Sequence, residues 1–435
     1  MFMLSQEIAD KIVALVRRDV TPALGCTEPI SLALAAAIAA SYLTAPVKCI
    51  QAKVSPNLMK NGMGVTVPGT GMVGLPIAAA VGAIAGDPKA GLEVLKKIQV
   101  SDVEQAKLML KTQQVIVEIA ETDNPLYSEA LLFSQDNDYV RVCIQDNHTN
   151  VISIEKNGVF LYQQPVKQIE ISDQENIFEA LTVESLYQFA IQVELEKIAF
   201  IAEAEKLNSA LSEEGLNHQY GLHIGLTLKK QIECGLLADD LLSKIIIGTT
   251  AASDARMGGA LLPAMSNSGS GNQGITATMP IVIVARFVKA NDEKLVRALF
   301  LSHLVAIYIH SKLPTLSALC AVSTAAMGSA AGMAWLLGGD FKTISYAICS
   351  MIGDISGVLC DGAANSCAMK VSTGVCSAYK AVLMALDHTR VTGSEGIVEH
   401  CVDRSINNLC AIARQSMVYT DRQIIQIMTE KPQDC

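Results

Sequence analysis

Three long stretches without charge limit most strongly what this chain can fold into. Residues 29–47, 61–86 and 313–339 each run for nineteen residues or more with almost no charged side chain. Uncharged runs of this length normally indicate membrane spans. Here they are rich in Ala, Gly, Ser and Thr, the second contains Pro68 and Pro76, and one Trp leaves little for interfacial aromatic belts. We therefore expect buried helices of a large core, with a polytopic membrane protein, such as a transporter of small amino acids, as the alternative.

Length and charge narrow the class of partner. A chain of 435 residues that is 50% hydrophobic can bury large cores and suggests two or three domains. A formal net charge of −10 leaves no excess of Lys and Arg to neutralise nucleic acid or an anionic membrane surface. Small molecules are the expected partners, and the apolar content is compatible with a homodimer.

Cysteine usage indicates the compartment. Twelve cysteines are spread along the chain, and residues 1–18 lack the charged and apolar regions of an export signal. In a reducing cytosol such thiols serve as core residues, metal ligands or nucleophiles rather than disulfides. We expect a cytoplasmic protein.

Periodicity predicts an α+β fold. Apolar spacing predicts a helix over 4–18 and an Ala-rich helix to about Ser41, and alternation predicts strands at 47–54, 114–119, 138–144, 151–154 and 159–163. Beyond Asn176 the pattern predicts helices at about 178–187, 190–211, 216–235, 238–252, 290–311, 314–336, 341–352 and 403–413. We predict a mainly α-helical catalytic domain with an inserted smaller α+β domain: residues 1–46 pack with the C-terminal helical domain, 47–172 form the α+β domain, and 173–435 form the helical domain.

Polar, glycine-rich loops interrupt this apolar helical part at 253–259 and 266–274. Loops of this kind inside an apolar domain are candidates for ligand binding, although ordinary connectors remain the alternative. A further glycine-rich segment at 65–71 precedes a helix and resembles an anion cradle, but it lacks the spacing of a nucleotide-binding P-loop.

Thiols stand at four notable positions. Cys360 and Cys367 flank a polar segment in which Asp361-Gly362 predicts a turn, and Cys320 lies forty residues upstream of Cys360. Cys26 lies near the start of the Ala-rich helix, where the helix dipole is expected to lower the pKa of a thiol. Buried free cysteines remain an alternative for all four.

Three thiolates can hold an iron–sulfur cube by three corners and leave one iron open as a Lewis acid. Zinc is the alternative metal, but paired Cys-x-x-Cys motifs or nearby histidines are absent around these positions. A serine hydrolase is disfavoured because no Gly-x-Ser-x-Gly elbow is present.

Five segments, in matching order along nearly the whole chain, resemble the L-cysteine desulfidase family, which is related to the α-chain of iron–sulfur L-serine dehydratases. They are residues 21–29, 60–62 with 67–70, 253–259, 268–274 and 360–367. The resemblance implies a lyase that degrades L-cysteine to pyruvate, ammonia and sulfide with a [4Fe–4S] cluster. The alternatives are an L-serine dehydratase, or one for another β-substituted amino acid, and a cluster-bearing sensor that only binds its ligand.

The resemblance also implies roles for single residues. Cys320, Cys360 and Cys367 would be the cluster ligands and Cys26 the catalytic thiol, with Glu28 as the alternative base. For substrate binding we select the polar side chains of the matching loops: Lys60, Asn61, Arg256, Ser268 and Asn272. A terminal cysteine caps the open iron in related dehydratases, and the last residue, Cys435, is a candidate for this role.

Overall fold

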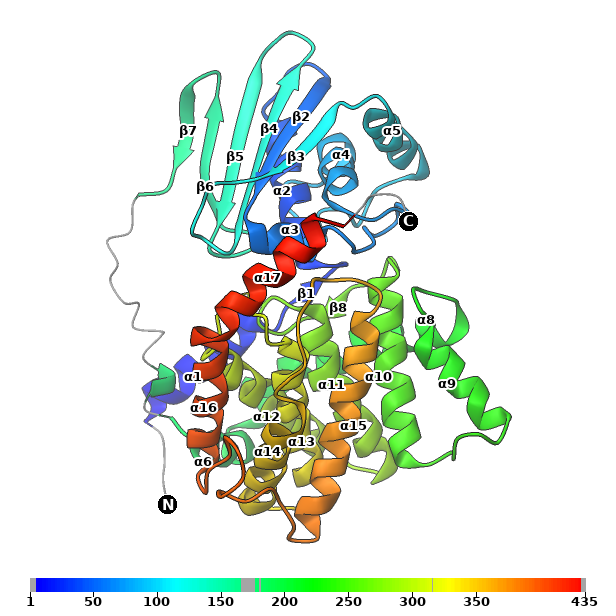
Figure 1. Cartoon of the computed structure of the whole chain (residues 1–435), viewed down its shortest axis with the longest axis vertical. Coiled ribbons are helices and arrows are strands. Elements are labelled where there is room, and N and C mark those ends of the chain that lie inside the picture. Colours follow the sequence, from blue (N-terminus) through cyan, green and yellow to red (C-terminus); the bar gives the residue numbers. More distant parts are fainter. Residues whose placement is uncertain (1–4, 166–176, 180, 315, 432–435) are drawn as a thin grey trace.

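The computed structural model describes residues 5–165, 177–179, 181–314 and 316–431. A six-stranded sheet with its helices stacks on a larger all-helical unit (Figure 1). The predicted α+β class is confirmed. Cys435 lies outside the described residues, so the expected cap stays a prediction.

The sheet has the strand order β3-β2-β4-β5-β6-β7 and is antiparallel except for the parallel pair β2–β3. Along β4 the burial alternates, so that Ser128, Ala130 and Leu132 face inward. The strands are β2 (Val47–Val54), β3 (Val115–Ile119), β4 (Tyr127–Ser134), β5 (Tyr139–Gln145), β6 (Val151–Lys156) and β7 (Val159–Gln163).

Helices cover the inner face of this sheet. Nearly every residue of α2 is buried, and α4 packs closely beside it, because a Cβ at Gly82 would lie only 2.4 Å from the carbonyl oxygen of Ala33. A helix that is apolar all round belongs in a core. The helices of this unit are α2 (Thr27–Ser41), α3 (Pro56–Gly62), α4 (Leu75–Ala85) and α5 (Val100–Lys111).

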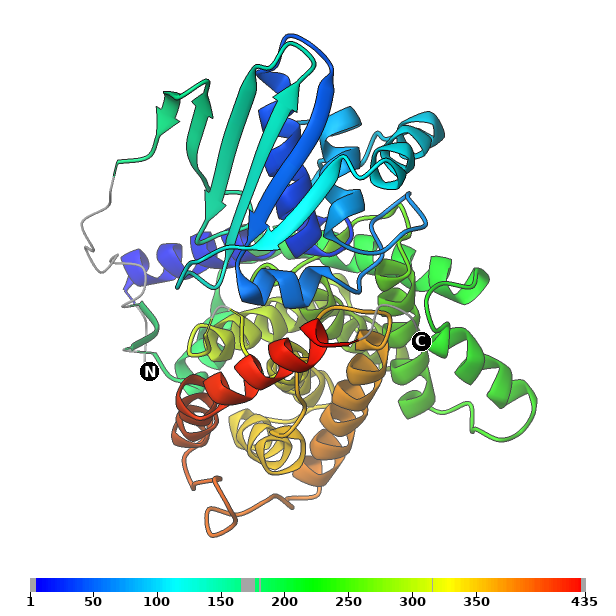
Figure 2. The ribbon, with the colours of Figure 1, turned by 45° about the horizontal axis from the view of Figure 1, so that its top comes forward.

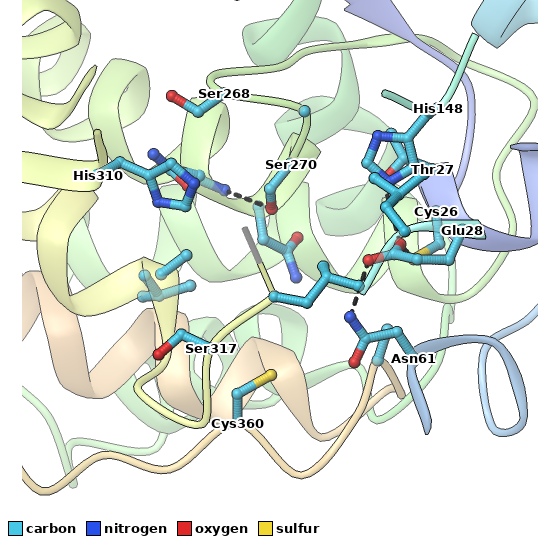
Figure 3. Close-up of a pocket in the computed structure, with 18 of the residues that line it drawn as sticks. Cys26, Thr27, Glu28, Asn61, His148, Ser268, Ser270, His310, Ser317 and Cys360 are labelled. Carbon is cyan, nitrogen blue, oxygen red and sulfur yellow. Dashed lines mark hydrogen bonds between the residues drawn. The ribbon is translucent and has the colours of Figure 1, made fainter. Parts of the chain in front are cut away.

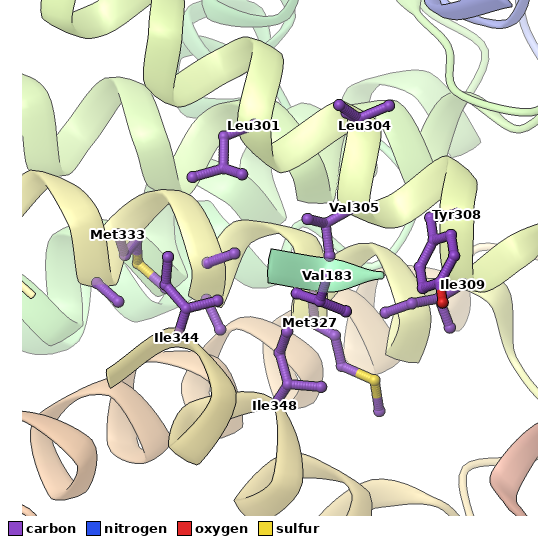
Figure 4. Close-up of a cluster of buried hydrophobic side chains, with 14 of the residues drawn as sticks. Val183, Leu301, Leu304, Val305, Tyr308, Ile309, Met327, Met333, Ile344 and Ile348 are labelled. Carbon is purple, nitrogen blue, oxygen red and sulfur yellow. The ribbon is translucent and has the colours of Figure 1, made fainter. Parts of the chain in front are cut away.

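The larger unit surrounds the buried helices α12 and α13. Figure 4 shows their side chains, among them Leu304 and Met327, interleaving with Ile348 of α14. Its helices are α1 (Gln6–Asp19), α6 (Val183–Gln192), α7 (Leu195–Ile198), α8 (Ala202–Asn217), α9 (Ile224–Glu233), α10 (Leu241–Met257), α11 (Gly271–Phe287), α12 (Asp292–His310), α13 (Ala321–Leu336), α14 (Phe341–Ile355), α15 (Cys367–Leu386), α16 (Val402–Gln415) and α17 (Met417–Thr429).

The three uncharged runs are thus interior segments, as expected: two supply α2 and α4, and the third supplies α13. Small side chains let these helices approach their neighbours closely. A Cβ at Gly328 of α13, for example, would lie 2.3 Å from the carbonyl oxygen of Ser302 in α12. Among the described residues, no helix is both long enough and apolar enough to cross a membrane.

A strand pair and a helix contact are among the interactions that join the two units. The strand β1 (Pro22–Ala23) pairs with β8 (Ala264–Met265), and α17 extends from the helical unit to α3, beside which it lies in both views (Figures 1 and 2). The N-terminal helices divide between the units: α1 packs in the helical core, whereas α2 packs on the sheet. For α2 this differs from the packing expected for residues 1–46, because its apolar surface is covered by strand side chains. The domain boundaries themselves stay predictions.

Sequence patterns do not predict α3, β4, α11, α15 and α17. The start of α11 falls in the predicted loop 266–274, because the glycines and polar side chains of residues 271–274 are typical of loops. In the structure Ser270 caps α11, its hydroxyl accepting from the backbone N–H of Gln273 at 3.4 Å.

Candidate active site

A cavity of about 750 Å³ lies where the two units meet. Both units contribute to its wall: the sheet unit supplies the start of α2, Asn61 of α3 and the loop 146–149. The helical unit supplies the ends of α10 and α12, the start of α11, and the segments around the three thiols. Figure 3 shows the labelled side chains gathered around this space. Polar groups thus converge from segments that are far apart in sequence.

The start of α2 places a thiol beside a carboxylate. Cys26 is the N-cap residue, and its thiol donates to Glu28 Oε2 at 2.9 Å. The hydroxyl of Thr27 donates to the same oxygen at 3.0 Å, and Asn61 Nδ2 donates to Oε1 at 2.9 Å. All four side chains are buried. This arrangement gives Glu28 a full set of donors that favour its ionised form.

Glu28 is held as a carboxylate. Burial acts to raise its pKa, but the charge of His148 and the hydrogen bonds from Cys26 and Asn61 outweigh it, so the pKa lies below the usual 4.5. Burial lowers the pKa of His148 in turn, so this imidazole is neutral at pH 7. At that pH the hydrogen bonds from Cys26 and Asn61 are the side-chain contacts that still lower the pKa of Glu28.

The expectation for Cys26 is wrong in one respect. Its position at a helix N-terminus predicts a lowered pKa, but burial, followed by the adjacent Glu28 charge, raises the pKa of the thiol well above its usual 9.0. The Arg256 charge opposes this shift without reversing it. At rest, Cys26 is a protonated donor and Glu28 is the acceptor.

Arg256 is a buried cation on the cavity wall. It is 4% exposed, its Nε donates to the carbonyl oxygen of Gly25 at 3.1 Å, and Nη1 lies 3.2 Å from Met257 Sδ. In the described part of the chain no carboxylate forms an ion pair with it. A Cβ at Gly271 would lie 2.2 Å from Nε, so the start of α11 must be glycine here. A buried guanidinium without a counterion is suited to bind an anionic group of a ligand.

Two other predicted substrate-binding residues also line the cavity. Asn272 accepts a hydrogen bond from Ser253 Oγ at 3.0 Å through Oδ1. Ser268 adopts a positive φ of 48°, and its hydroxyl donates to Asn267 Oδ1 at 2.9 Å. The structure therefore brings Asn61, Arg256, Ser268 and Asn272 to one cavity, and their role in substrate binding stays a prediction.

Lys60 does not line the cavity. Its ammonium forms a buried ion pair with Asp421 of α17 at 2.5 Å and donates to the carbonyl oxygen of Cys360 at 3.4 Å. Asn57 Nδ2 donates to the same aspartate. We expected Lys60 to lie beside the substrate. In the structure it instead joins α17 to the segment that contains Cys360.

The three predicted ligand thiols share one wall. Cys320 is the N-cap of α13 and Cys367 begins α15. The Cys320 and Cys360 backbones are joined by hydrogen bonds from Cys320 N to Val358 O (2.9 Å) and from Cys360 N to Ala318 O (2.7 Å). Burial first, and then the charges of Cys360 and Cys367, raise the pKa of Cys320 to about 12. The thiols are therefore near enough to act on one another.

Three free thiols on one wall fit the ligand set of a cube with one open iron. Within the residues that the structure describes, no three His, Cys, Asp or Glu side chains converge closely enough to hold a single metal ion. A cube of four irons and four sulfides spans a larger space than one ion. Its ligation by these thiols stays a prediction.

Sequence reasoning missed several residues of the wall. His148 lies on the loop between β5 and β6, close to Glu28 (Figure 3), and packs against Gly269, whose Cβ would lie 3.3 Å from the imidazole ring. Gln273 and His310 also line the cavity. A lone histidine in a hairpin loop gives no local signal of this role, because the fold alone brings it to the cavity.

Comparison with known proteins finds a family model and relatives that match most of the chain. A family model described as the serine dehydratase alpha chain matches residues 89–426. A UPF0597 protein of Actinobacillus pleuropneumoniae is 67% identical over 426 residues, which cover 98% of each chain. A UPF0597 protein of Dichelobacter nodosus is 61% identical over 427 residues, 98% of each chain. The UPF0597 protein YhaM of Escherichia coli is 59% identical over 424 residues, 97% of each chain.

Proposed function

Because the chain belongs to the serine dehydratase alpha-chain family, we propose that it is a lyase that eliminates the β-substituent of a small L-amino acid. L-Cysteine is the first candidate substrate, with pyruvate, ammonia and sulfide as products. L-Serine is the second, and the description of the matching family favours it. One observation carries the proposal: a buried arginine with no ion-pair partner among the described residues, a Cys26–Glu28 pair and three thiols line the same cavity.

Removal of the α-proton falls to the pair formed by Cys26 and Glu28. The resting pair holds one proton, on the thiol, with the carboxylate as hydrogen-bond acceptor. The carboxylate takes the α-proton directly, or it takes the thiol proton while the sulfur takes the α-proton. In both cases the pair ends with two protons, and the electrons of the C–H bond form the α,β double bond as the β-substituent leaves.

Arg256 binds the substrate carboxylate. Its guanidinium is a fixed cation. Nε donates to Gly25 and one N–H of Nη1 points to Met257, which leaves Nη2 and the second N–H of Nη1 for a bidentate contact. Such a contact holds the α-carbon in place against the base. When bound to Cys320, Cys360 and Cys367, a [4Fe–4S] cluster supplies an open iron that acts as a Lewis acid toward the departing heteroatom. The enamine product becomes an imine, and water hydrolyses it to pyruvate and ammonia.

The thiol and carboxylate that carry this step are little exposed to bulk water. Cys26 and Glu28 are buried, and His148 of the sheet unit contacts Gly269 of the helical unit on the same cavity wall. An electrostatic interaction between fixed groups is stronger in such a site than in water. The proposal includes a cytoplasmic location, consistent with the many free thiols, and a homodimer stays a prediction.

The test is anaerobic purification followed by assay of sulfide, ammonia and pyruvate with L-cysteine and with L-serine. We expect a brown protein that releases pyruvate from at least one of them and prefers L-cysteine. A protein prepared in air should be colourless and inactive, because an iron without a protein ligand is the easiest to lose. A brown protein that releases no product from either amino acid would favour the ligand-binding sensor.

Cysteine variants separate ligand loss from general damage. Cys367→Ala should lose the cluster absorbance and activity together. Cys376→Ala, in the same helix but outside the cavity wall, is the matched control and should keep both. Equal iron content in the two variants would contradict the ligand assignment.

A further inference from the structure

Buried amide groups in the cavity wall, and Asn267 in contact with one of them, have orientations that their partners determine. Asn267 lies 3.2 Å from the carbonyl oxygen of His303, which can only accept a hydrogen bond. Asn267 must therefore direct its Nδ2 toward that carbonyl, and its Oδ1 toward Gln273 and Ser268. Gln273 faces this oxygen at 2.9 Å, so it must present its Nε2.

These contacts leave one side-chain oxygen, Oε1 of Gln273, without a hydrogen-bond donor among the described residues. Gln273 is 0% exposed. A buried carbonyl oxygen without a donor is costly, and native proteins rarely leave one unless a ligand, ion or water completes it. Gln273 lines the cavity.

Asn61, in the sheet unit, is a second buried amide whose nitrogen has a partner and whose oxygen has none among the described residues. The ionised carboxylate of Glu28 can only accept, so Asn61 must direct Nδ2 toward it, as the 2.9 Å contact shows. Its Oδ1 is then a second buried oxygen without a partner on the same cavity. The two oxygens belong to α11 and α3 and are both fixed as acceptors.

Building on the proposed function, we propose that the oxygens of Asn61 and Gln273 bind the α-ammonium group of the substrate. An ammonium has three N–H donors and a positive charge, which match two acceptor oxygens and the Glu28 carboxylate that Asn61 contacts. Arg256 supplies the complementary cation for the substrate carboxylate. The cavity therefore recognises a zwitterion, and Gln273 is the residue that restricts its substrates to α-amino acids.

Binding of two small probes to the full chain tests this subsite without turnover. L-Alanine carries both charged groups and no leaving group, and propionate lacks only the ammonium. Isothermal titration of the chain, with and without its reconstituted cluster, should show L-alanine binding at least about tenfold more tightly, since hydrogen bonds to charged groups contribute on that scale. Equal affinity for the two probes, or no binding of L-alanine, would overturn the proposal. This test uses the unsubstituted chain alone.

Gln273→Met keeps the length of the side chain and removes the acceptor. It should weaken L-alanine about tenfold and leave propionate unchanged. Thr276→Val is the matched control, because Thr276 lies in the same helix, is fully buried and also has an unpartnered oxygen, but it does not line the cavity. A parallel loss for both probes in Gln273→Met would show a merely structural role.

The outcomes separate this subsite from the proposed reaction. Selective L-alanine binding by a protein that eliminates nothing would refute the lyase and keep the ammonium subsite. If the protein eliminates a β-substituent but its Gln273→Met variant still prefers L-alanine to propionate, the lyase is supported and the ammonium subsite is refuted.

Discussion

Replacing Asp421 by alanine should destabilise the contact between the C-terminal helix and the sheet unit. The Lys60 side chain is 0% exposed and that of Asp421 is 10% exposed, and their ion pair is the only one that Lys60 forms in the described part of the chain. The substitution leaves the ammonium with the carbonyl oxygen of Cys360, 3.4 Å away, as its remaining acceptor. A buried charge is thus left without a counterion.

The expected cost is about 3–5 kcal/mol, the usual effect of removing one partner from a buried pair. An exposed pair offers the comparison. Lys107 and Glu104 lie 2.9 Å apart with side chains 40% and 64% exposed, so Glu104→Ala should cost less than about 1 kcal/mol. Each variant removes one carboxylate from one lysine. The difference between their free energies of unfolding therefore measures the effect of burying the pair.

Urea unfolding followed by circular dichroism measures the free energies, and hydrogen exchange in α3 and α17 locates the change. The double variant Lys60→Met/Asp421→Leu removes both charges and should recover most of the loss. A loss below about 1 kcal/mol in Asp421→Ala, or no recovery in the double variant, would refute the conclusion that this pair holds α17 in place.

Three further outcomes are expected. Cys26→Ala should abolish turnover without changing the absorbance of the cluster, and normal turnover would exclude the thiol from the reaction. Asn272→Ala should raise KM or lower kcat while circular dichroism stays unchanged; unaltered kinetics would count against the start of α11 as a binding site. Burial lowers the pKa of His303 to about 3 from 6.5, so the unfolded chain binds the additional proton between these values. The stability that neutral His303 contributes is therefore complete above about pH 6.5 and is lost as the pH falls toward 3. Urea unfolding at several pH values should show a shallower acid loss in His303→Gln, and an unchanged slope would contradict this reading.

Local pattern determined much of the fold. The uncharged runs predicted interior helices because a helix that is apolar all round has no face for water, and α2, α4 and α13 are such helices. Alternation located β2 and β5, since the two faces of these strands have different surroundings. It did not locate β4, whose inward side includes the polar Ser128 and Ser134. Ser128 is satisfied by Ser31 of α2 at 3.0 Å, a contact between residues far apart in the chain.

The site shows the same division. Motifs in the sequence selected Cys26, Glu28, Asn61 and Arg256, which share one cavity, because each stands in a polar or glycine-rich break in an apolar background. They gave no sign of His148, whose neighbours along the chain are ordinary for a loop. Gln273 lies within the predicted ligand-binding loop 266–274, but nothing in the sequence distinguishes it from the other polar residues of that loop.

Tertiary structure decided the charge states and the partners. The start of a helix favours a thiolate, and that effect is local enough to read from the sequence. Desolvation and the charge of Glu28 depend on everything packed around Cys26, and together they raise the pKa of its thiol. Lys60 gives the second case, because its counterion lies 361 residues away on α17. Burial and long-range pairing are properties of the folded chain, since they arise only when distant segments exclude water from the same place.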